Sequence, residues 1–336
     1  MNTAPGLPES PLLQDAQRAL LAGDWRAGAR HLEQAATIAR ATNRADDAAR
    51  CLQMATNLHR FSGDVHEAMR TSGEMNGIDL DVRMKFVAAA ERAESLLATG
   101  NTVAATQQWR IAAKLADELD LPAVPRAAIT RRLAFCEMES GDPATAKQLF
   151  AAARAAHRGA GDLLGGAWVA LEHANCAQEA GDSEAASRAL EVASRDAQAL
   201  ARGATPADSI AHLLCELELA RARLSAARGA LDAAETSARA AREVALESAS
   251  PLGYFTAAAL LSYYADLRDA RLVTYTALAT AWVTLGDLVG RDLARSWVQP
   301  LLEVYREKWS ADTFDAIKRE HDDQRRAARG ASQPAA

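Results

Sequence analysis

The stretch ESGDPATAKQLFAAA at residues 139–153 contains the pattern that decides the fold. Gly141 can adopt the left-handed conformation that closes one helix, and Asp142 followed by Pro143 is a typical start of the next. Small residues then follow five and twelve positions after the glycine, with the bulky Phe150 between them. The stretch therefore predicts two helices that are joined by a tight turn and packed closely.

The same turn recurs along the chain. It is AGDW at Gly23, SGDV at Gly63, TGNT at Gly100, SGDP at Gly141 and AGDS at Gly181, so that successive copies are about 40 residues apart. Weaker copies are RGAL at Gly229 and LGDL at Gly286, which follow after longer intervals. A helix–turn–helix pattern at a nearly fixed period indicates a helical solenoid.

Small residues keep the same register around these turns. Five residues after six of the glycines stand Gly28, Ala68, Ala105, Ala146, Ala186 and Ala234. Twelve residues after them stand Ala35, Met75, Ala112, Ala153, Ala193 and Ala241. Seven residues before all seven glycines stand Ala16, Thr56, Ala93, Ala134, Ala174, Ala222 and Ala279. Small side chains at fixed offsets are expected where two helices cross closely.

Composition agrees with an all-α fold. Hydrophobic residues make up 49% of the 336 residues, but many are alanine, and aromatic residues are only 5%. Alanine favours helices, whereas strands prefer branched and aromatic residues. No alternating run is long enough to predict a strand.

The register resembles that of the tetratricopeptide repeat superfamily over roughly residues 10–300. The small residue before the turn, the Gly-Asp turn and the alanines five and twelve residues after it carry the resemblance. The long period is similar to that of kinesin light chains and of helical arms in some bacterial regulators. The resemblance implies a right-handed superhelical α-solenoid of about seven repeats, whose concave face binds peptides or proteins.

The last part of the chain has a different composition. All five tyrosines and ten of the aromatic residues fall within residues 251–314, and the long interval before Gly286 leaves room for an extra helix at about 251–266. We therefore expect a solenoid at 10–249 and a divergent repeat with an aromatic-rich helical cap at 250–328. The aromatic cluster forms either the core of this cap or an interface with a second copy of the chain. Residues 1–9 and 329–336 are expected to be disordered.

The glycines of GAGDLLGG at residues 159–166 outline a phosphate-binding loop, but their context does not fit one. Gly159 and Gly161 precede the turn at Gly181 by the offsets at which other units have their ordinary connecting loops. The preceding segment is helical in pattern, whereas a dinucleotide-binding loop follows a strand. The stretch is predicted to be a loop between repeats.

No catalytic, metal or cofactor site is indicated. Cys136 and Cys176 occupy equivalent positions, but with His173 they supply too few ligands to close a zinc site, so we expect them in the core. The net charge of −6 argues against nucleic acid as a partner. The N-terminus lacks the features of a signal peptide, and no apolar run is long enough to predict a membrane span. We expect a cytoplasmic protein with no membrane partner.

The resemblance implies which side chains face the groove. Positions six and ten before each turn glycine point inward, and those two and three before it lie at the rim. The groove candidates in the second, fourth and fifth repeats are Gln53, Asn57, Arg60, Arg131, Phe135, Glu139, Asn175, Gln178 and Glu179, with Trp168 one helical turn further back. The same offsets include Phe61, Met138 and Leu171.

Amides, arginines and aromatic residues in such rows can hold an extended backbone or a partner helix. Some tetratricopeptide domains grip a C-terminal carboxylate with Lys, Asn and Arg, but Gln53 stands where that lysine would be. The main hypothesis is a non-catalytic scaffold or adaptor that binds a peptide or protein. The alternatives are a signalling regulator whose solenoid changes shape when a ligand or peptide binds, and an enzyme with an undetected site.

Overall fold

The structure is a computed structural model that describes residues 10–203 and 205–331. Within these residues it consists of sixteen α-helices and contains no strand, which confirms the all-α prediction. The helices are α1 (Pro11–Leu21), α2 (Trp25–Ala41), α3 (Ala45–Phe61), α4 (Val65–Met75), α5 (Val82–Ala98), α6 (Thr102–Glu118), α7 (Ala123–Glu139), α8 (Pro143–Gly159), α9 (Leu163–Glu179), α10 (Ser183–Ala201), α11 (Ala207–Ala227), α12 (Leu231–Glu247), α13 (Pro251–Leu267), α14 (Arg271–Val289), α15 (Arg291–Trp309) and α16 (Ala311–Ala331).

Consecutive helices pair as hairpins, and each turn closes in the same way. At the first turn the amide of Gly23 donates to the carbonyl of Leu20, the amide of Asp24 donates to that of Ala19, and Gly23 has a φ of +76°. This is the Schellman arrangement that satisfies the last carbonyls of a helix. The Asp24 carboxylate then accepts from the amide of Ala27 and caps α2. Local chemistry therefore fixes both the end of one helix and the start of the next.

The predicted small residues lie where the helices cross. All the positions five and twelve residues after the first six turn glycines are buried, as are the positions seven residues before those glycines. Alanine methyl groups at most of these positions let two helices approach closely, and bulky neighbours such as Leu32 and Phe150 fill the remaining space. The repeat register read from the sequence is confirmed for six hairpins.

The seventh turn differs from the prediction. Gly286 lies inside α14, and the turn falls at Asp269, which has a φ of +54° and follows Gly229 by one regular repeat period. The amide of Ala270 donates to the carbonyl of Ala265, so the turn has the same hydrogen bond as the others. Ser262, Thr274 and Ala281 occupy the buried positions of the register around Asp269. The predicted helix at 251–266 is α13, and it is the first helix of a regular seventh hairpin rather than an extra one.

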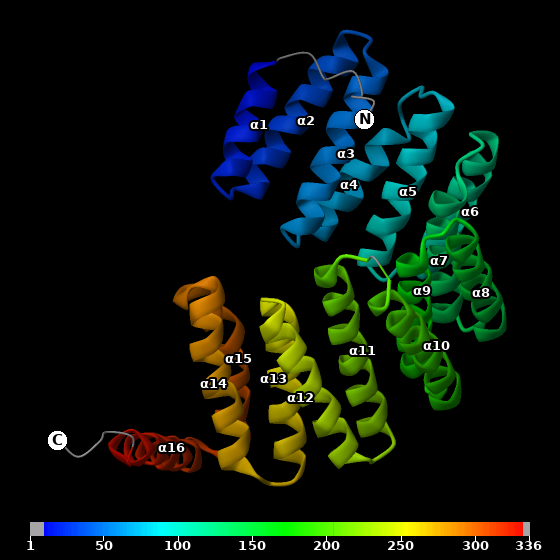
Figure 1. Cartoon of the computed structure of the whole chain (residues 1–336). Coiled ribbons are helices and arrows are strands. Elements are labelled where there is room, and N and C mark those ends of the chain that lie inside the picture. The colour runs from blue at the N-terminus through cyan, green and yellow to red at the C-terminus, as the bar shows by residue number, and fades with distance from the viewer. Residues whose placement is uncertain (1–9, 204, 332–336) are drawn as a thin grey trace. The chain divides into compact units, whose positions relative to one another are not determined.

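The chain divides into two compact units, Met1–Asp162 and Leu163–Ala336. Within the units, three pairs of first helices from successive hairpins contact one another directly: α3 contacts α5, α9 contacts α11, and α11 contacts α13. No comparable contact joins consecutive second helices from α2 to α14 within either unit of the described structure. The first helices therefore make the closer-packed side, which we call the first-helix face. Figure 1 shows the hairpins of each unit.

Helices α15 and α16 follow the seventh hairpin and pack against α14. Six of the ten aromatic residues at 251–314 are buried. Of all ten, only Tyr263 is exposed, with 50% of its surface accessible to solvent. The Trp309 indole nitrogen donates to Oδ1 of Asp266 at 3.0 Å, and the rings of Tyr305 and Trp309 stack with centroids 5.0 Å apart. Most of the aromatic cluster is therefore core within its own unit.

Both ends of the chain were expected to be disordered. Residues 1–9 and 332–336 lie outside the described residues. Residues 329–331 were assigned to the same tail but belong to α16. The predicted boundary near residue 250 stays a prediction.

One helix qualifies the expectation that the chain has no membrane-spanning segment. By length and composition alone, α14 could cross a membrane, and it is the one described helix that meets this test. A core helix of a soluble protein can meet the same test, so this is weak evidence. Leu278, Ala281 and Leu285 of α14 are fully buried in the second unit.

Candidate binding surfaces

Three of the predicted groove residues converge on one carboxylate in the first unit. Gln53, Asn57 and Arg60 lie on one face of α3, and Glu91 lies on α5, the neighbouring first helix. Oε1 of Glu91 accepts from the Gln53 amide at 3.2 Å and from the Asn57 amide at 3.5 Å. Oε2 accepts from the Arg60 guanidinium at 2.7 Å, and Arg60 also donates to the Asn57 side chain. The four side chains form a connected polar cluster on the first-helix face.

This polar cluster is partly shielded from water. The Arg60 side chain is 23% exposed and that of Glu91 is 12% exposed. Glu91 was not among the predicted residues because it lies nine positions before Gly100, between the offsets of the family's groove. The positive charge of Arg60 is balanced within the protein, so the cluster offers mainly amide groups and guanidinium N–H groups to a ligand.

The other predicted residues of the first unit lie on α7. Arg131 and Phe135 are half-buried, and Glu139 is exposed in the last turn of the helix. Met138 at the same rim offset is buried in the core, so it does not contribute to a surface. Helix α7 is connected to α5 by an ion pair between Arg132 and Glu94 at 2.8 Å. These residues extend the polar and aromatic character of the first-helix face beyond the α3–α5 pair.

The remaining candidates lie on α9, in the second unit. Trp168, Asn175 and Gln178 are half-buried, and Glu179 is exposed. The Trp168 ring lies 5.1 Å from the ring of His212, an exposed residue on the neighbouring first helix α11. Leu171, which the offsets also placed inward, is buried with Leu213 in the core, because an apolar side chain at this position packs between the helices.

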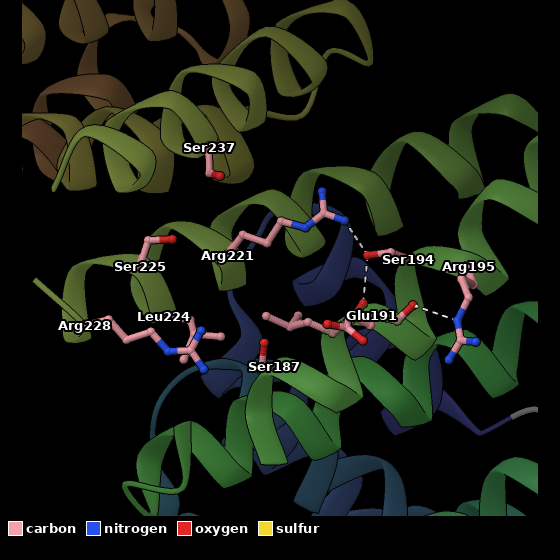
Figure 2. A pocket seen from close by; sticks show the side chains of 10 residues that line it. Ser187, Glu191, Ser194, Arg195, Arg221, Leu224, Ser225, Arg228 and Ser237 are labelled. Atoms are coloured by element: carbon pink, nitrogen blue, oxygen red, sulfur yellow. Dashed lines mark hydrogen bonds between the residues drawn. The ribbon is translucent and has the colours of Figure 1, made fainter. Parts of the chain in front are cut away.

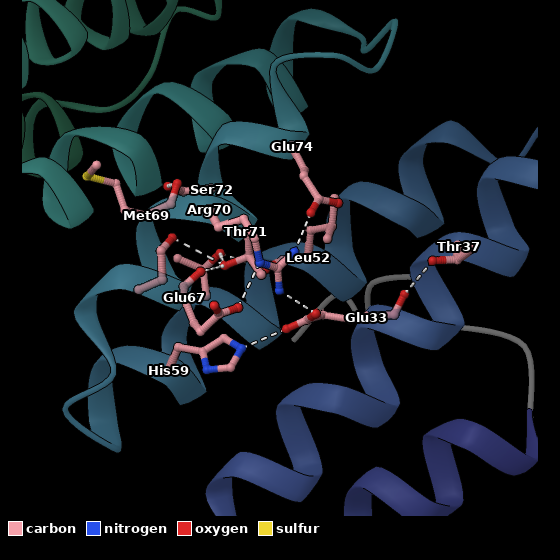
Figure 3. A network of polar contacts seen from close by, with 12 residues as sticks. Glu33, Thr37, Leu52, His59, Glu67, Met69, Arg70, Thr71, Ser72 and Glu74 are labelled. Carbon is pink, nitrogen blue, oxygen red and sulfur yellow. Dashed lines mark hydrogen bonds and ion pairs between the residues drawn. The ribbon is translucent and has the colours of Figure 1, made fainter.

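A separate polar network crosses the first two repeats (Figure 3). The Arg70 guanidinium of α4 donates to Glu33 of α2 at 2.5 Å and to Glu67 at 2.7 Å, and it also binds Glu74. Nε2 of the buried His59 lies 2.7 Å from Oε1 of Glu33. Burial opposes the charged form of Arg70, but its hydrogen bonds with Glu33 and Glu67 outweigh this and raise its pKa.

Ligand atoms of Glu33, His59 and Glu67 lie within 4.8 Å of one another, a spacing that could hold a metal ion. The Arg70 guanidinium already binds both carboxylates, so the positive charge that a cation would supply is provided by the chain itself. The arrangement therefore serves to hold α2, α3 and α4 together.

All four cysteines are buried core residues, as expected for Cys136 and Cys176. Burial raises the pKa of the Cys51, Cys136 and Cys215 thiols to about 11. A thiol is nucleophilic and binds metals as the thiolate, which this pKa disfavours at neutral pH. These three positions therefore serve packing rather than chemistry.

The GAGDLLGG stretch contains the predicted turn between repeats, but the turn is shorter than expected: only residues 160–162 form it, and residues 163–166 are the first turn of α9. Helix α8 ends at Gly159, Gly161 has a φ of +77°, and α9 begins at Leu163. The Asp162 amide donates to the carbonyl of His157, which repeats the helix-closing hydrogen bond of the other turns. A helix rather than a strand precedes the loop, so the geometry of a dinucleotide site is not present here.

A polar pocket that the sequence analysis did not anticipate lies in the second unit (Figure 2). It has a volume of about 570 Å³ and is lined by residues of α10, α11 and α12. Arg195, Arg221 and Arg228 contribute three guanidinium groups, and four serines contribute hydroxyls. The sequence signal for this pocket was the helical spacing of three polar residues along α11 and its C-cap. These residues, Arg221, Ser225 and Arg228, lie outside the groove offsets.

Comparisons with known proteins define the fold. No family model matches the chain, and no curated protein matches it in sequence. Among solved structures, the apo form of the quorum sensor NprR from B. thuringiensis aligns with a TM-score of 0.54 at 12% identity, over 91% of this chain and 84% of that one. A tetratricopeptide repeat protein from Parabacteroides merdae ATCC 43184 aligns with a TM-score of 0.53 at 14% identity, over 86% and 96%.

A Rap protein complexed with Competence and Sporulation Factor aligns with a TM-score of 0.52 at 10% identity, over 94% of this chain and 97% of that one. Identities this low establish the fold alone. The helix pairs and their turns define an α-solenoid of helical hairpins. This solenoid is of the tetratricopeptide-repeat-like kind, as the register of small residues indicated.

Proposed function

We propose that this chain is a non-catalytic interaction module that binds a peptide or protein segment on its first-helix face. The observation that carries this proposal is the polar cluster of Gln53, Asn57, Arg60 and Glu91. Core packing does not require three hydrogen-bond donors to be gathered around one carboxylate between two helices. Side-chain amides held in this way present donors and acceptors that match those of an extended backbone.

The charges of the cluster favour a neutral or basic ligand segment. Glu91 accepts from all three donors on α3, so an incoming carboxylate would have to displace it from Arg60. Together with Gln53 at the position of the family's lysine, this argues against recognition of a C-terminal carboxylate. We propose that backbone recognition at the cluster is supplemented by apolar contacts to the half-buried Phe135 on α7 of the same unit.

The proposal is tested by selecting peptides from a displayed random library and measuring their affinities by fluorescence anisotropy. Asn57→Ala with Arg60→Ala, and separately Phe135→Ala, are expected to weaken binding about tenfold or more. The control is Gln107→Ala, an exposed amide on the second helix α6. Peptides that bind the variants and the parent equally would show that the ligand uses another surface.

A second candidate function is a regulator whose shape changes when a peptide or other ligand binds. The division into two units that are each compact favours this candidate, because such units can reorient without losing their own cores. Small-angle scattering of the chain with and without a selected peptide distinguishes the two. A change in the radius of gyration supports the regulator, and an unchanged profile supports a rigid scaffold.

Some classes of partner are not part of the proposed function. Because the chain has a net charge of −6, nucleic acid is not proposed as a partner. Neither a cofactor nor a membrane is part of the proposed function. A cytoplasmic location and a role as an adaptor are proposed on the same grounds.

A further inference from the structure

The pocket between α10 and α12 has an unusual charge. Helices α10 and α11 supply most of its lining, and α12 contributes Ser237 (Figure 2). Three arginines line it, whereas Glu191 is the only acidic lining residue among those described. A chain with more acidic than basic residues therefore gathers positive charge in one concave place.

Two of these guanidinium groups have no carboxylate partner within the described residues. Arg195 donates to the carbonyl of Glu191 at 3.4 Å, and Arg228 donates to the carbonyl of Ser183 at 2.5 Å. Two other arginines on these helices are paired with carboxylates: Arg188 binds Glu184, and Arg239 binds Glu235. Each guanidinium carries five N–H donors, so Arg195 and Arg228 keep most of theirs for a ligand.

The third arginine is held in place from both sides. The Arg221 guanidinium binds Glu218 through one nitrogen and the Ser194 hydroxyl through the other. The Ser194 hydroxyl in turn donates to the Leu190 carbonyl at 2.7 Å. Figure 2 shows Arg221 and Ser194 pointing toward one another in the pocket. This fixed hydrogen-bond chain positions a charged donor before any ligand arrives.

We propose that this pocket binds a phosphate monoester group. A phosphate monoester carries close to two negative charges and three acceptor oxygens at neutral pH, which matches unpaired guanidiniums flanked by serine hydroxyls. A single carboxylate would accept a pair of hydrogen bonds from only one of the guanidinium groups. The pocket is also larger than a phosphate group needs, so it has room for part of the molecule that carries the group.

The source of the phosphate group is either a phosphorylated peptide or a small phosphorylated metabolite, and the chemistry of recognition is the same. None of the lining residues of the pocket is among the residues of the first-helix face that carry the proposed function. The inference therefore goes beyond the proposed function and does not depend on it.

The test is calorimetric titration of the full chain with inorganic phosphate, O-phosphoserine, and a short peptide with and without one phosphoserine. Saturable binding of the phosphorylated probes, with no binding of the unphosphorylated peptide, is the expected result. Tighter binding of the phosphopeptide than of O-phosphoserine assigns the site to a protein ligand, and equal affinities assign it to a small molecule.

The variants are Arg195→Ala combined with Arg228→Ala, and Arg228→Lys alone. Because both arginines are exposed and unpaired with acids, melting curves should match those of the parent. The double variant is expected to lose about tenfold or more in affinity. Arg228→Lys is expected to lose less, because lysine keeps the positive charge but not the paired N–H donors of the guanidinium. The matched control is Arg188→Ala on α10. The inference is overturned if no probe saturates, or if Arg188→Ala weakens binding as much as the double variant.

Discussion

Arg60 of α3 and Glu91 of α5 are joined by an ion pair at 2.7 Å, and they lie on first helices of successive hairpins. The same carboxylate accepts from Gln53 and Asn57, so a single acidic residue organises every predicted polar groove residue of the second repeat. Removing it would leave the Gln53 and Asn57 amide groups without this acceptor and Arg60 with only its hydrogen bond to Asn57, and would loosen the contact between the two helices.

We predict that Glu91→Ala lowers the free energy of unfolding by about 1–3 kcal/mol, because the half-buried donors lose a charged acceptor. In a double-mutant cycle with Arg60→Ala, the coupling energy should be about 1 kcal/mol, larger than for a fully exposed pair. Urea denaturation measures both, and Glu118→Ala at the exposed end of α6 is the control. A coupling energy near zero would mean that the pair does not join the helices.

The seventh turn gives a second prediction. Because Asp269 has a positive φ, Asp269→Gly should be neutral or stabilising by up to about 1 kcal/mol, whereas Asp269→Val should destabilise by about 1–2 kcal/mol. Gly286 lies inside α14, and a Cβ there would meet only the Arg291 side chain at 3.8 Å. Gly286→Ala should therefore stabilise the helix by about 0.5–1 kcal/mol. Thermal melts measure these changes. A Gly286→Ala variant that is less stable than the parent would indicate that the turn lies at Gly286 rather than at Asp269.

These two positions also show how far the sequence could predict the fold. The register of small residues was sufficient for six hairpins because glycine is the residue that most readily closes a helix with a positive φ. The seventh hairpin is closed by Asp269. Aspartate adopts the left-handed conformation less readily than glycine does, but it can adopt it. A pattern based on glycine alone therefore misses the real turn and points instead to Gly286, which is helical.

The placement of the candidate binding residues was predictable only in part. Fixed offsets found Gln53, Asn57 and Arg60, because residues spaced by three and four lie on one helix face. They failed at Leu171, where the side chain is apolar and turns into the core. The pocket of Arg195, Arg221 and Arg228 depends on how α10 packs against α11, which no single-helix pattern contains.

The cysteines provide a prediction that depends on pH. Burial raises the pKa of the Cys51, Cys136 and Cys215 thiols from 9.0 to about 11, so the folded chain keeps protons that the unfolded chain releases. Their stabilising contribution is complete below pH 9 and is lost as the pH rises through 11. At about pH 8 these thiols should react with a disulfide reagent at least about a hundredfold more slowly than in the denatured chain. Rapid reaction without unfolding would contradict their burial.

The C-terminal aromatic residues should stabilise their own unit. Trp309 is buried, hydrogen-bonded to Asp266 and stacked on Tyr305, so Trp309→Ala should cost about 3–5 kcal/mol. Tyr263→Ala, at an exposed ring in the same region, is the control and should cost much less. On this view the chain sediments as a monomer. A dimer that Tyr263→Ala dissociates would instead assign the remaining exposed aromatic surface to an interface with a second copy.

The central claim is that a peptide or protein segment binds the first-helix face, and amide hydrogen exchange of the chain with a selected peptide tests it most directly. We predict that slowing of exchange is concentrated in α3, α5 and α7, which carry the polar cluster and Phe135. The second helices α4 and α6 should exchange at the same rate with and without the peptide. Protection confined to these second helices, with none in α3, α5 or α7, would contradict the account.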